Sequence, residues 1–188
     1  MGRLIYSVIG SLDGYVEDAA GSFEWAAPDE QVFAFVNQLE RPIGTYPYGR
    51  RMYQTMVHWE TAPRGRTPVE RDFAEIWRSA EKVVFSSKAE VASSLRTRVE
   101  HRFDPDVVRR LKQSSVRDLT VGGACLAGAA IRAGVVDELQ LIVLPVVVCA
   151  GKPYLQAGVP WTLELVDHLR FDSGTVFLRY RSPSASPP

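Results

Sequence analysis

Apolar residues along the chain follow two spacings, one typical of buried strands and one typical of amphipathic helices. Residues 4–9 form a short apolar run that stops at glycine and other turn-forming residues, so they predict a buried first strand. After Pro28, apolar residues recur at positions 32, 35, 36 and 39, which is the stripe of an amphipathic helix. Similar stripes follow Pro68 and Pro105, so the pattern predicts strands and helices that alternate along the chain.

The clearest organisation lies between residues 118 and 148. Residues 119–121 predict a strand, Gly122–Gly123 a tight turn, residues 124–133 a helix, and residues 139–148 a long buried strand. Strand, helix and strand within about 30 residues are typical of a parallel crossover unit. Ligands of sheets built in this way bind at the carboxyl ends of the strands.

The C-terminal part of the chain predicts an antiparallel hairpin. Residues 162–171 and 175–181 indicate two strands, and the Asp-Ser-Gly sequence at 172–174 is typical of the turn between them. We therefore expect a single α/β domain over residues 1–181, with a mainly parallel sheet and this hairpin at its edge. Residues 182–188 contain only Ser, Pro and Ala and predict a disordered tail.

Composition narrows the classes of function. The chain has 188 residues, 46% of them hydrophobic, and its 22 basic and 22 acidic residues give a formal charge of zero. Such a chain has no general attraction to nucleic acid or to anionic membranes, so neither is expected as a partner. The longest apolar run, residues 141–150, contains Pro145 and is too short to span a bilayer. Cys125 and Cys149 lack the spacing of a metal site, so we expect no metal and a cytoplasmic location.

Three turns could contact phosphate. Gly122–Gly123 joins a strand to a helix, where free N–H groups face outward, and Ser86–Ser87 follows the strand predicted over residues 82–85. Arg50 and Arg51 begin a predicted helix after Gly49, and cations at the positive end of a helix are unfavourable unless an anion binds there. Taken alone, the Gly122–Gly123 turn is equally consistent with a ligand-free loop, and Arg50 and Arg51 with a solvated turn whose arginines reach carboxylates elsewhere. For the Ser86–Ser87 turn alone, a ligand-free loop is favoured, because serine is common in loops. Together they favour a dinucleotide that carries several phosphates.

Acid–base chemistry has few candidates. The sequence lacks a Gly-x-Gly-x-x-Gly fingerprint, a P-loop and a Gly-x-Ser-x-Gly elbow, which excludes the common nucleotide-binding and hydrolase motifs. Asp13 in the first loop and Asp29 or Glu30 at the next helix are the carboxylates in suitable positions. The alternative is structural, because Asp13–Gly14 is a typical turn pair and Asp29 a typical helix N-terminal residue.

The order of these turns resembles the dihydrofolate reductase fold, and more closely the reductase domain at the C-terminus of the bifunctional riboflavin-biosynthesis deaminase-reductase. The resemblance extends over nearly all of residues 3–181. It rests on Ser11–Leu12–Asp13–Gly14, Gly49–Arg50–Arg51–Met52–Tyr53, Lys82 to Ser87, Val121–Gly122–Gly123 with Leu126, and the stretch from Ala133 to Leu139 through Pro145–Val146–Val147 to Gly151–Lys152–Pro153.

The resemblance implies a three-layer dihydrofolate reductase-like fold and NADPH as the cofactor. It implies that Gly49, Arg50 and Arg51 hold the pyrophosphate and the added ribose phosphate. Ser86 and Ser87 would lie near the adenosine. The remaining implied contacts are Val121, Gly122, Gly123 and Ala124 at the nicotinamide and pyrophosphate, and Val8, Ile9 and Val16 in the nicotinamide pocket.

The implied activity is hydride transfer to a C=N or C=O carbon of a small heterocyclic or ribosylaminopyrimidine substrate, such as 5-amino-6-(5-phosphoribosylamino)uracil. A pterin or folate substrate and a non-catalytic nucleotide-binding module of the same fold are the alternatives. Trp25 followed by an acid resembles the proton-donor region of folate reductases, with a spacing that fits Glu30 slightly better than Asp29. Related reductase domains also imply a homodimer.

Overall fold

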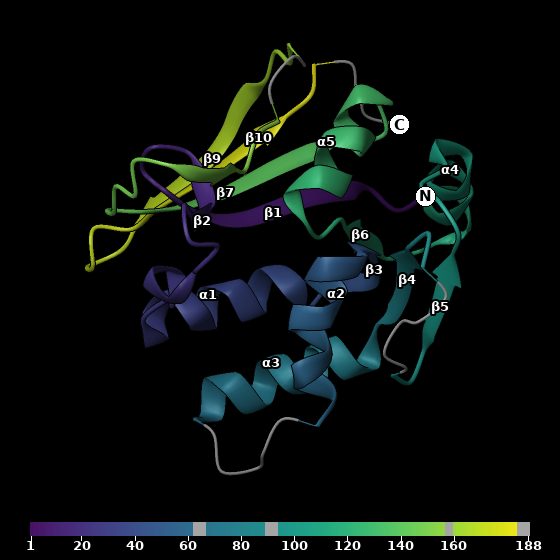
Figure 1. Cartoon of the computed structure of the whole chain (residues 1–188), viewed down its shortest axis with the longest axis horizontal. Helices are drawn as coiled ribbons and strands as arrows, with labels where there is room; N and C mark the ends of the chain where they lie inside the picture. Colours follow the sequence, from purple (N-terminus) through teal and green to yellow (C-terminus); the bar gives the residue numbers. More distant parts are fainter. Residues whose placement is uncertain (62–66, 89–93, 157–159, 184–188) are drawn as a thin grey trace.

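An eight-stranded sheet runs through the protein, with helices on both of its faces (Figure 1). The computed structural model describes residues 1–61, 67–88, 94–156 and 160–183. The strands of the large sheet are β1 (Leu4–Ser11), β3 (Ile43–Gly49), β4 (Glu81–Phe85), β5 (Thr97–Glu100), β6 (Asp118–Thr120), β7 (Glu138–Leu144), β9 (Glu164–Arg170) and β10 (Val176–Arg181), and β2 (Tyr15–Asp18) pairs with β8 (Gly151–Pro153) in a second, smaller sheet.

The strand order is β5-β4-β3-β6-β1-β7-β10-β9. The six strands from β5 to β7 pair in parallel, whereas β10 is antiparallel to both β7 and β9. This arrangement confirms the predicted α/β class with a mostly parallel sheet and an antiparallel C-terminal hairpin. The predicted crossover from β6 to β7 also forms, but β1 lies between these two strands.

Helices cover the two faces of the sheet. They are α1 (Glu30–Glu40), α2 (Arg50–Met56), α3 (Pro68–Ser79), α4 (Pro105–Ser114) and α5 (Ala124–Arg132), with short 3-10 helices η1 (Glu24–Ala26) and η2 (Val57–Glu60). Residues of α1 and α3 pack against one face, and residues of α4 and α5 pack against the other. The result is the three-layer arrangement of helices, sheet and helices that the resemblance implies.

Local sequence determines where the helices begin. The Asp29 carboxylate accepts a hydrogen bond from Val32 N at 2.9 Å and caps α1, as its position before the stripe predicts. Thr67 and Glu70 form a reciprocal capping box at the start of α3, in which each side chain bonds to a backbone N–H of the other residue. Asp104 accepts a bond from Asp106 N at the start of α4. These caps satisfy N–H groups that have no partner within their own helix.

The long strand predicted over residues 139–148 is shorter in the structure. β7 ends at Leu144 because Pro145 has no N–H to donate, and the following backbone turns, with Val146 N donating to Leu144 O. Cys149, in the same turn, has a positive φ of 66°. The loop after β7 therefore folds back towards β2 instead of extending the sheet.

Candidate functional site

The three turns that the sequence predicts to contact phosphate lie next to one another at the carboxyl edge of the sheet. They follow β4, β3 and β6, which are neighbours in the sheet. Gly49 pairs with Phe85, the residue before Ser86, and Tyr48 forms a bridge with Gly122. Turns that are more than 30 residues apart in sequence thus form one continuous rim, as expected for the ligand side of a parallel sheet.

The junction between the turns after β3 and β6 is closely packed. Gly122 N donates to Pro47 O at 2.8 Å, and Gly49 N donates to Gly122 O at 3.1 Å. A Cβ on Gly122 would overlap the Tyr48 ring and lie 3.2 Å from Met52 Cγ, and Gly123 has a φ of 99°. These two glycines are therefore required both by close approach and by backbone conformation. They bring the first turns of α2 and α5 together.

Arg50 and Arg51 begin α2 at this junction, with Gly49 as the residue before them. The Arg50 guanidinium donates to the Gln54 amide oxygen at 3.2 Å, and Arg51 is exposed. Across the described residues neither guanidinium pairs with a carboxylate. The alternative in which these arginines serve nearby acids is not what the structure shows, so both charges are available to an anion.

The turn after β4 differs from the other two. The Ser86 hydroxyl donates to Lys88 O at 3.0 Å and accepts from Lys88 N at 3.1 Å, and Ser86 is buried. Ser87 is exposed. The Ser86 side chain thus closes its own turn, and Ser87 is the hydroxyl of this pair that is open to solvent.

The predicted contacts on the first strand do not share one face. Val8 packs with the apolar cluster on the α5 side of the sheet, and Ile9 packs with the cluster around α1. Val16 is half-buried in β2, where the pairing register with β8 shifts between Tyr15 and Glu17. Val121 and Ala124, by contrast, are both buried beside the Gly122–Gly123 turn.

Asp13 connects the loop after β1 to the loop after β7. Its carboxylate accepts hydrogen bonds from Cys149 N at 2.7 Å and Val148 N at 3.3 Å. A hydrogen bond from the Ser11 hydroxyl, together with those two backbone bonds, lowers the pKa of Asp13 below its ordinary value. Asp13 is therefore ionised near neutral pH, which favours a role in fixing the loop over a role as an acid.

The two acids at α1 differ in their contacts. The hydrogen bond from Val32 N, and a weaker contribution from the Ser173 hydroxyl, lower the pKa of Asp29. Asp29 is thus engaged as a helix cap. Glu30 is exposed in the first turn and has no hydrogen-bond or ion-pair partner among the described residues. Of the three predicted carboxylates, Glu30 alone has a side chain without a structural contact.

Tyr154 packs against the end of β1, a contact that the sequence gives no reason to expect. Its ring lies against Gly10 near the end of β1, where an added Cβ would lie 2.6 Å from Tyr154 Cδ1. Tyr154 N donates to Gly14 O, and Tyr154 O accepts from the Tyr6 hydroxyl at 2.9 Å. Burial raises the pKa of the Tyr154 phenol. The signal in the sequence is only Gly10 within an apolar run, which indicates a close approach without naming the residue that approaches.

Metal-ligand clusters and membrane-spanning helices are both absent from the parts of the chain that the structure describes. No group of three or more His, Cys, Asp or Glu side chains there could hold a metal ion. None of the helices described above is long and apolar enough to cross a membrane.

Comparisons with known proteins show the family and the fold. A family model described as the RibD C-terminal domain matches residues 3–177. A curated protein of Bacillus subtilis (strain 168), named uncharacterized protein YyaP, is 28% identical over 183 residues, which is 95% of this chain and 94% of that protein.

Solved structures share the fold at low sequence identity. A putative riboflavin biosynthesis protein from Shewanella sp. PV-4 has a TM-score of 0.75 and 15% identity, over 97% of this chain and 99% of that chain. A deaminase/5-amino-6-(5-phosphoribosylamino)uracil reductase from Thermotoga maritima has a TM-score of 0.67 and 16% identity, over 96% of this chain and 56% of that chain. Enterococcus faecalis dihydrofolate reductase, complexed with NADP(H) and a second ligand, has a TM-score of 0.65 and 14% identity, over 97% of both chains.

Proposed function

The chain belongs to the RibD C-terminal domain family, and from this premise we propose that it is an NADPH-dependent reductase. Its proposed substrate is a small heterocycle of the ribosylaminopyrimidine type, the class named for the reductase from Thermotoga maritima. The observation that carries the proposal is the rim of three adjacent turns, with two arginines unpaired by carboxylates at its centre. The cytoplasmic location and the single domain over residues 1–181 remain predictions of the sequence.

The rim fits a phosphate-bearing dinucleotide. The first N–H groups of α2 and α5 have no partner within their helices, and both helices begin at the Gly49–Gly122 junction. Arg50 and Arg51 add cationic donors that bind phosphate oxygens in pairs. The glycines at 122 and 123 let Tyr48 and Met52 pack directly against the turn between the two helix starts. We infer that pyrophosphate and the added ribose phosphate bind here, with Ser87 nearer the adenosine.

Removal of either arginine should weaken NADPH binding. Each of Arg50→Ala and Arg51→Ala loses a charge-assisted contact worth about 1 to 3 kcal/mol, which corresponds to roughly a tenfold to hundredfold higher Kd in calorimetric titration. The variant that lacks the arginine contacting the added ribose phosphate should also lose the preference of the protein for NADPH over NADH. Arg132→Ala removes the same charge at the far end of α5 and should bind NADPH normally. If the wild-type protein does not bind NADPH at millimolar concentration, the proposed function is refuted.

NADPH supplies the hydride, and the protein positions it and provides a route for the proton. Asp13, Asp29 and Glu30 remain the candidate acids, and Glu30 is preferred because its carboxyl group is not engaged in the fold. Glu30→Gln should lower kcat by about tenfold, a modest loss since water can reach this exposed position. NADPH affinity should not change. Equal kcat for Glu30→Gln and the wild type at every pH would remove Glu30 from the reaction.

A non-catalytic nucleotide-binding module is the second candidate. The observation in its favour is that Asp13 and Asp29 are both used as backbone hydrogen-bond acceptors, which leaves one weakly supported acid. NADPH binding without oxidation by any ribosylaminopyrimidine, pterin or folate substrate would support this candidate. Turnover of one such substrate would exclude it and would also identify the substrate class.

We further propose the homodimer that the family resemblance implies. The long apolar strand β7 gives no support of its own, because it lies between β1 and β10 and is buried within one subunit. Light scattering should give a mass of about 42 kDa, twice the 20.9 kDa of one chain. A mass of one chain at micromolar concentration would contradict the dimer.

A further inference from the structure

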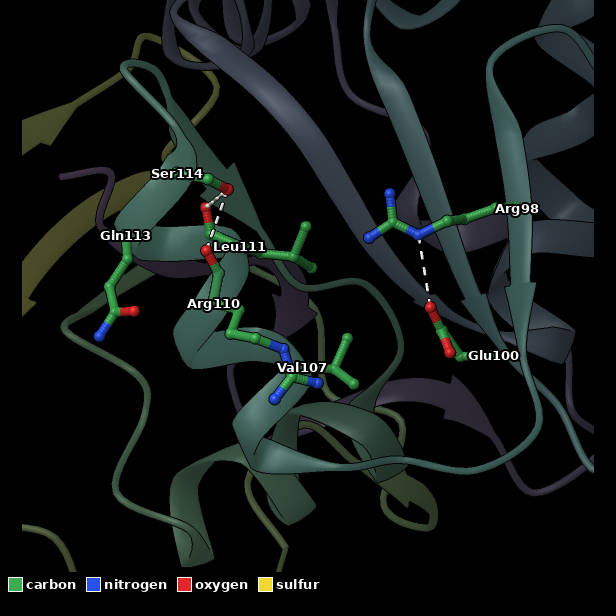
Figure 2. Close-up of a pocket in the computed structure, with 7 residues that line it drawn as sticks. All are labelled: Arg98, Glu100, Val107, Arg110, Leu111, Gln113 and Ser114. Carbon is green, nitrogen blue, oxygen red and sulfur yellow. Dashed lines mark hydrogen bonds and ion pairs between the residues drawn. The ribbon is translucent and has the colours of Figure 1, made fainter.

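A hollow of about 670 Å³ lies between α4 and the edge strand β5 (Figure 2). It borders the rim described above, because Ser86 N donates a hydrogen bond to the backbone oxygen of Glu100, which lines the hollow. Its volume is within the usual range of small-molecule sites, about 300 to 1,000 Å³. The seven residues that line it are Arg98, Glu100, Val107, Arg110, Leu111, Gln113 and Ser114.

Two periodicities build the walls of the hollow. Positions 107, 110, 111 and 114 lie on one stripe of α4, while Val108 and Lys112 on the adjoining stripe are buried. Arg98 and Glu100 are two residues apart on β5 and therefore share one face of the sheet. The hollow thus has an apolar floor from Val107 and Leu111 and a polar edge.

The charges at the polar edge of the hollow are unbalanced. Arg98 Nε contacts Glu100 Oε1 at 3.4 Å, and these side chains are 50% and 35% exposed. A long, exposed ion pair of this kind contributes little, so an incoming anion loses little by competing for Arg98. Arg110 has no hydrogen bond or ion pair from its guanidinium within the described residues, and its backbone oxygen accepts from the Ser114 hydroxyl. The hollow therefore has two guanidinium groups and one carboxylate, with the Arg98–Glu100 pair on the β5 wall and Arg110 on the α4 wall (Figure 2).

From these observations we propose that the hollow is a second ligand site, next to the rim, that binds a small organic phosphate monoester. The Arg98 and Arg110 guanidinium groups have the planar donor geometry that binds phosphate oxygens in pairs. Val107 and Leu111 contact the organic part of the ligand, which inorganic phosphate lacks. Glu100 limits the net positive charge and so disfavours large polyanions.

Calorimetric titrations of the full chain with AMP, inorganic phosphate and succinate test the proposal. AMP should bind with a Kd below about 5 mM, and at least fivefold more tightly than inorganic phosphate, because it also covers the apolar floor. Succinate should bind more weakly than AMP, since its two charges are separate. No saturable AMP binding, or equal affinities for AMP and succinate, would overturn the assignment.

The location of the site has its own test. Arg98→Gln with Arg110→Gln should weaken AMP by at least tenfold, whereas the matched double substitution Arg109→Gln with Arg132→Gln should not. Arg109 bonds to Asp106 and to Ala133 O, away from the hollow. AMP resembles the adenosine part of NADPH and can also bind the rim, so the titration is repeated with NADPH at saturation. The AMP binding that depends on Arg98 and Arg110 should then persist, whereas complete loss of AMP binding would place AMP in the rim and overturn the second site. A protein that fails to bind NADPH would refute the reductase proposal alone, since the dependence on Arg98 and Arg110 is measured without cofactor.

Discussion

Gly122→Ala is expected to destabilise the fold by about 3 kcal/mol and to abolish measurable NADPH binding. The new Cβ would occupy space held by the Tyr48 ring, and overpacking of a buried site costs about 1 to 3 kcal/mol or more. Tyr48 cannot move aside easily, because it stacks on Tyr46 with ring centroids 5.4 Å apart and its hydroxyl accepts from Trp77 Nε1. Relief must come from the backbone, which would separate the turns after β3 and β6.

Urea unfolding and cofactor titration measure the two effects. Gly134→Ala is the matched control, because Gly134 has a positive φ of 63° but nothing within 4 Å of an added Cβ. This control should lose about 1 kcal/mol from backbone strain and keep its NADPH affinity. A Gly122→Ala protein as stable as the wild type, with normal cofactor affinity, would show that the close junction is not required.

The second large effect is a dependence of stability on pH that comes from Glu40. This residue is at the end of α1 and is 8% exposed, and its Oε2 has no hydrogen-bond partner among the described residues. Burial raises the pKa of Glu40 to about 7, and the nearby Tyr46 hydroxyl offsets part of that increase. The unfolded chain therefore loses this proton at lower pH than the folded protein does. The stabilisation is complete below pH 4.5 and is lost as the pH rises to about 7.

Across that window the free energy of unfolding should fall by about 3 kcal/mol, the equivalent of the pKa difference. Glu40→Gln should remove this slope and make the protein more stable than the wild type above pH 7. Glu75→Gln, an exposed change of the same type on α3, should retain the slope. Urea titrations at half-unit pH steps give the free energy of unfolding of all three proteins. If this free energy falls with pH in Glu40→Gln as steeply as in the wild type, another group is responsible for the effect.

Most of the fold can be predicted from spacing, because long stripes and caps are local signals. The helix after Pro28 and the hairpin at residues 172–174 are examples. β2 and β8 could not be predicted, since they are three or four residues long and each is stabilised by a partner more than 130 residues away. β5 was missed for a similar reason, because the charged residues at 98 and 100 hide a short edge strand.

The candidate site was predicted less completely. The turns predicted to contact phosphate could be found because glycines between a strand and a helix, and cations at the start of a helix, have a direct physical meaning. The structural hydrogen bonds that individual side chains make could not be predicted, because they depend on tertiary contacts. Ser86 closes its own turn and Asp13 holds the backbone at residues 148 and 149. Residues 62–66, with Arg64 and Arg66, and most of the predicted tail at 182–188 lie outside the described residues.

The order of the strands also constrains how the chain folds during synthesis. β1 precedes the other strands in this sequence, yet both of its partners, β6 and β7, are more than 100 residues later. The partners end at residues 120 and 144, so β1 can pair on both sides only after about three quarters of the sequence has been made, a delay typical of slow folding and of exposure to aggregation. Binding of a chaperone to nascent residues 4–11 would shorten that exposure, and a circular permutant that begins at β6 should fold faster than the natural chain order.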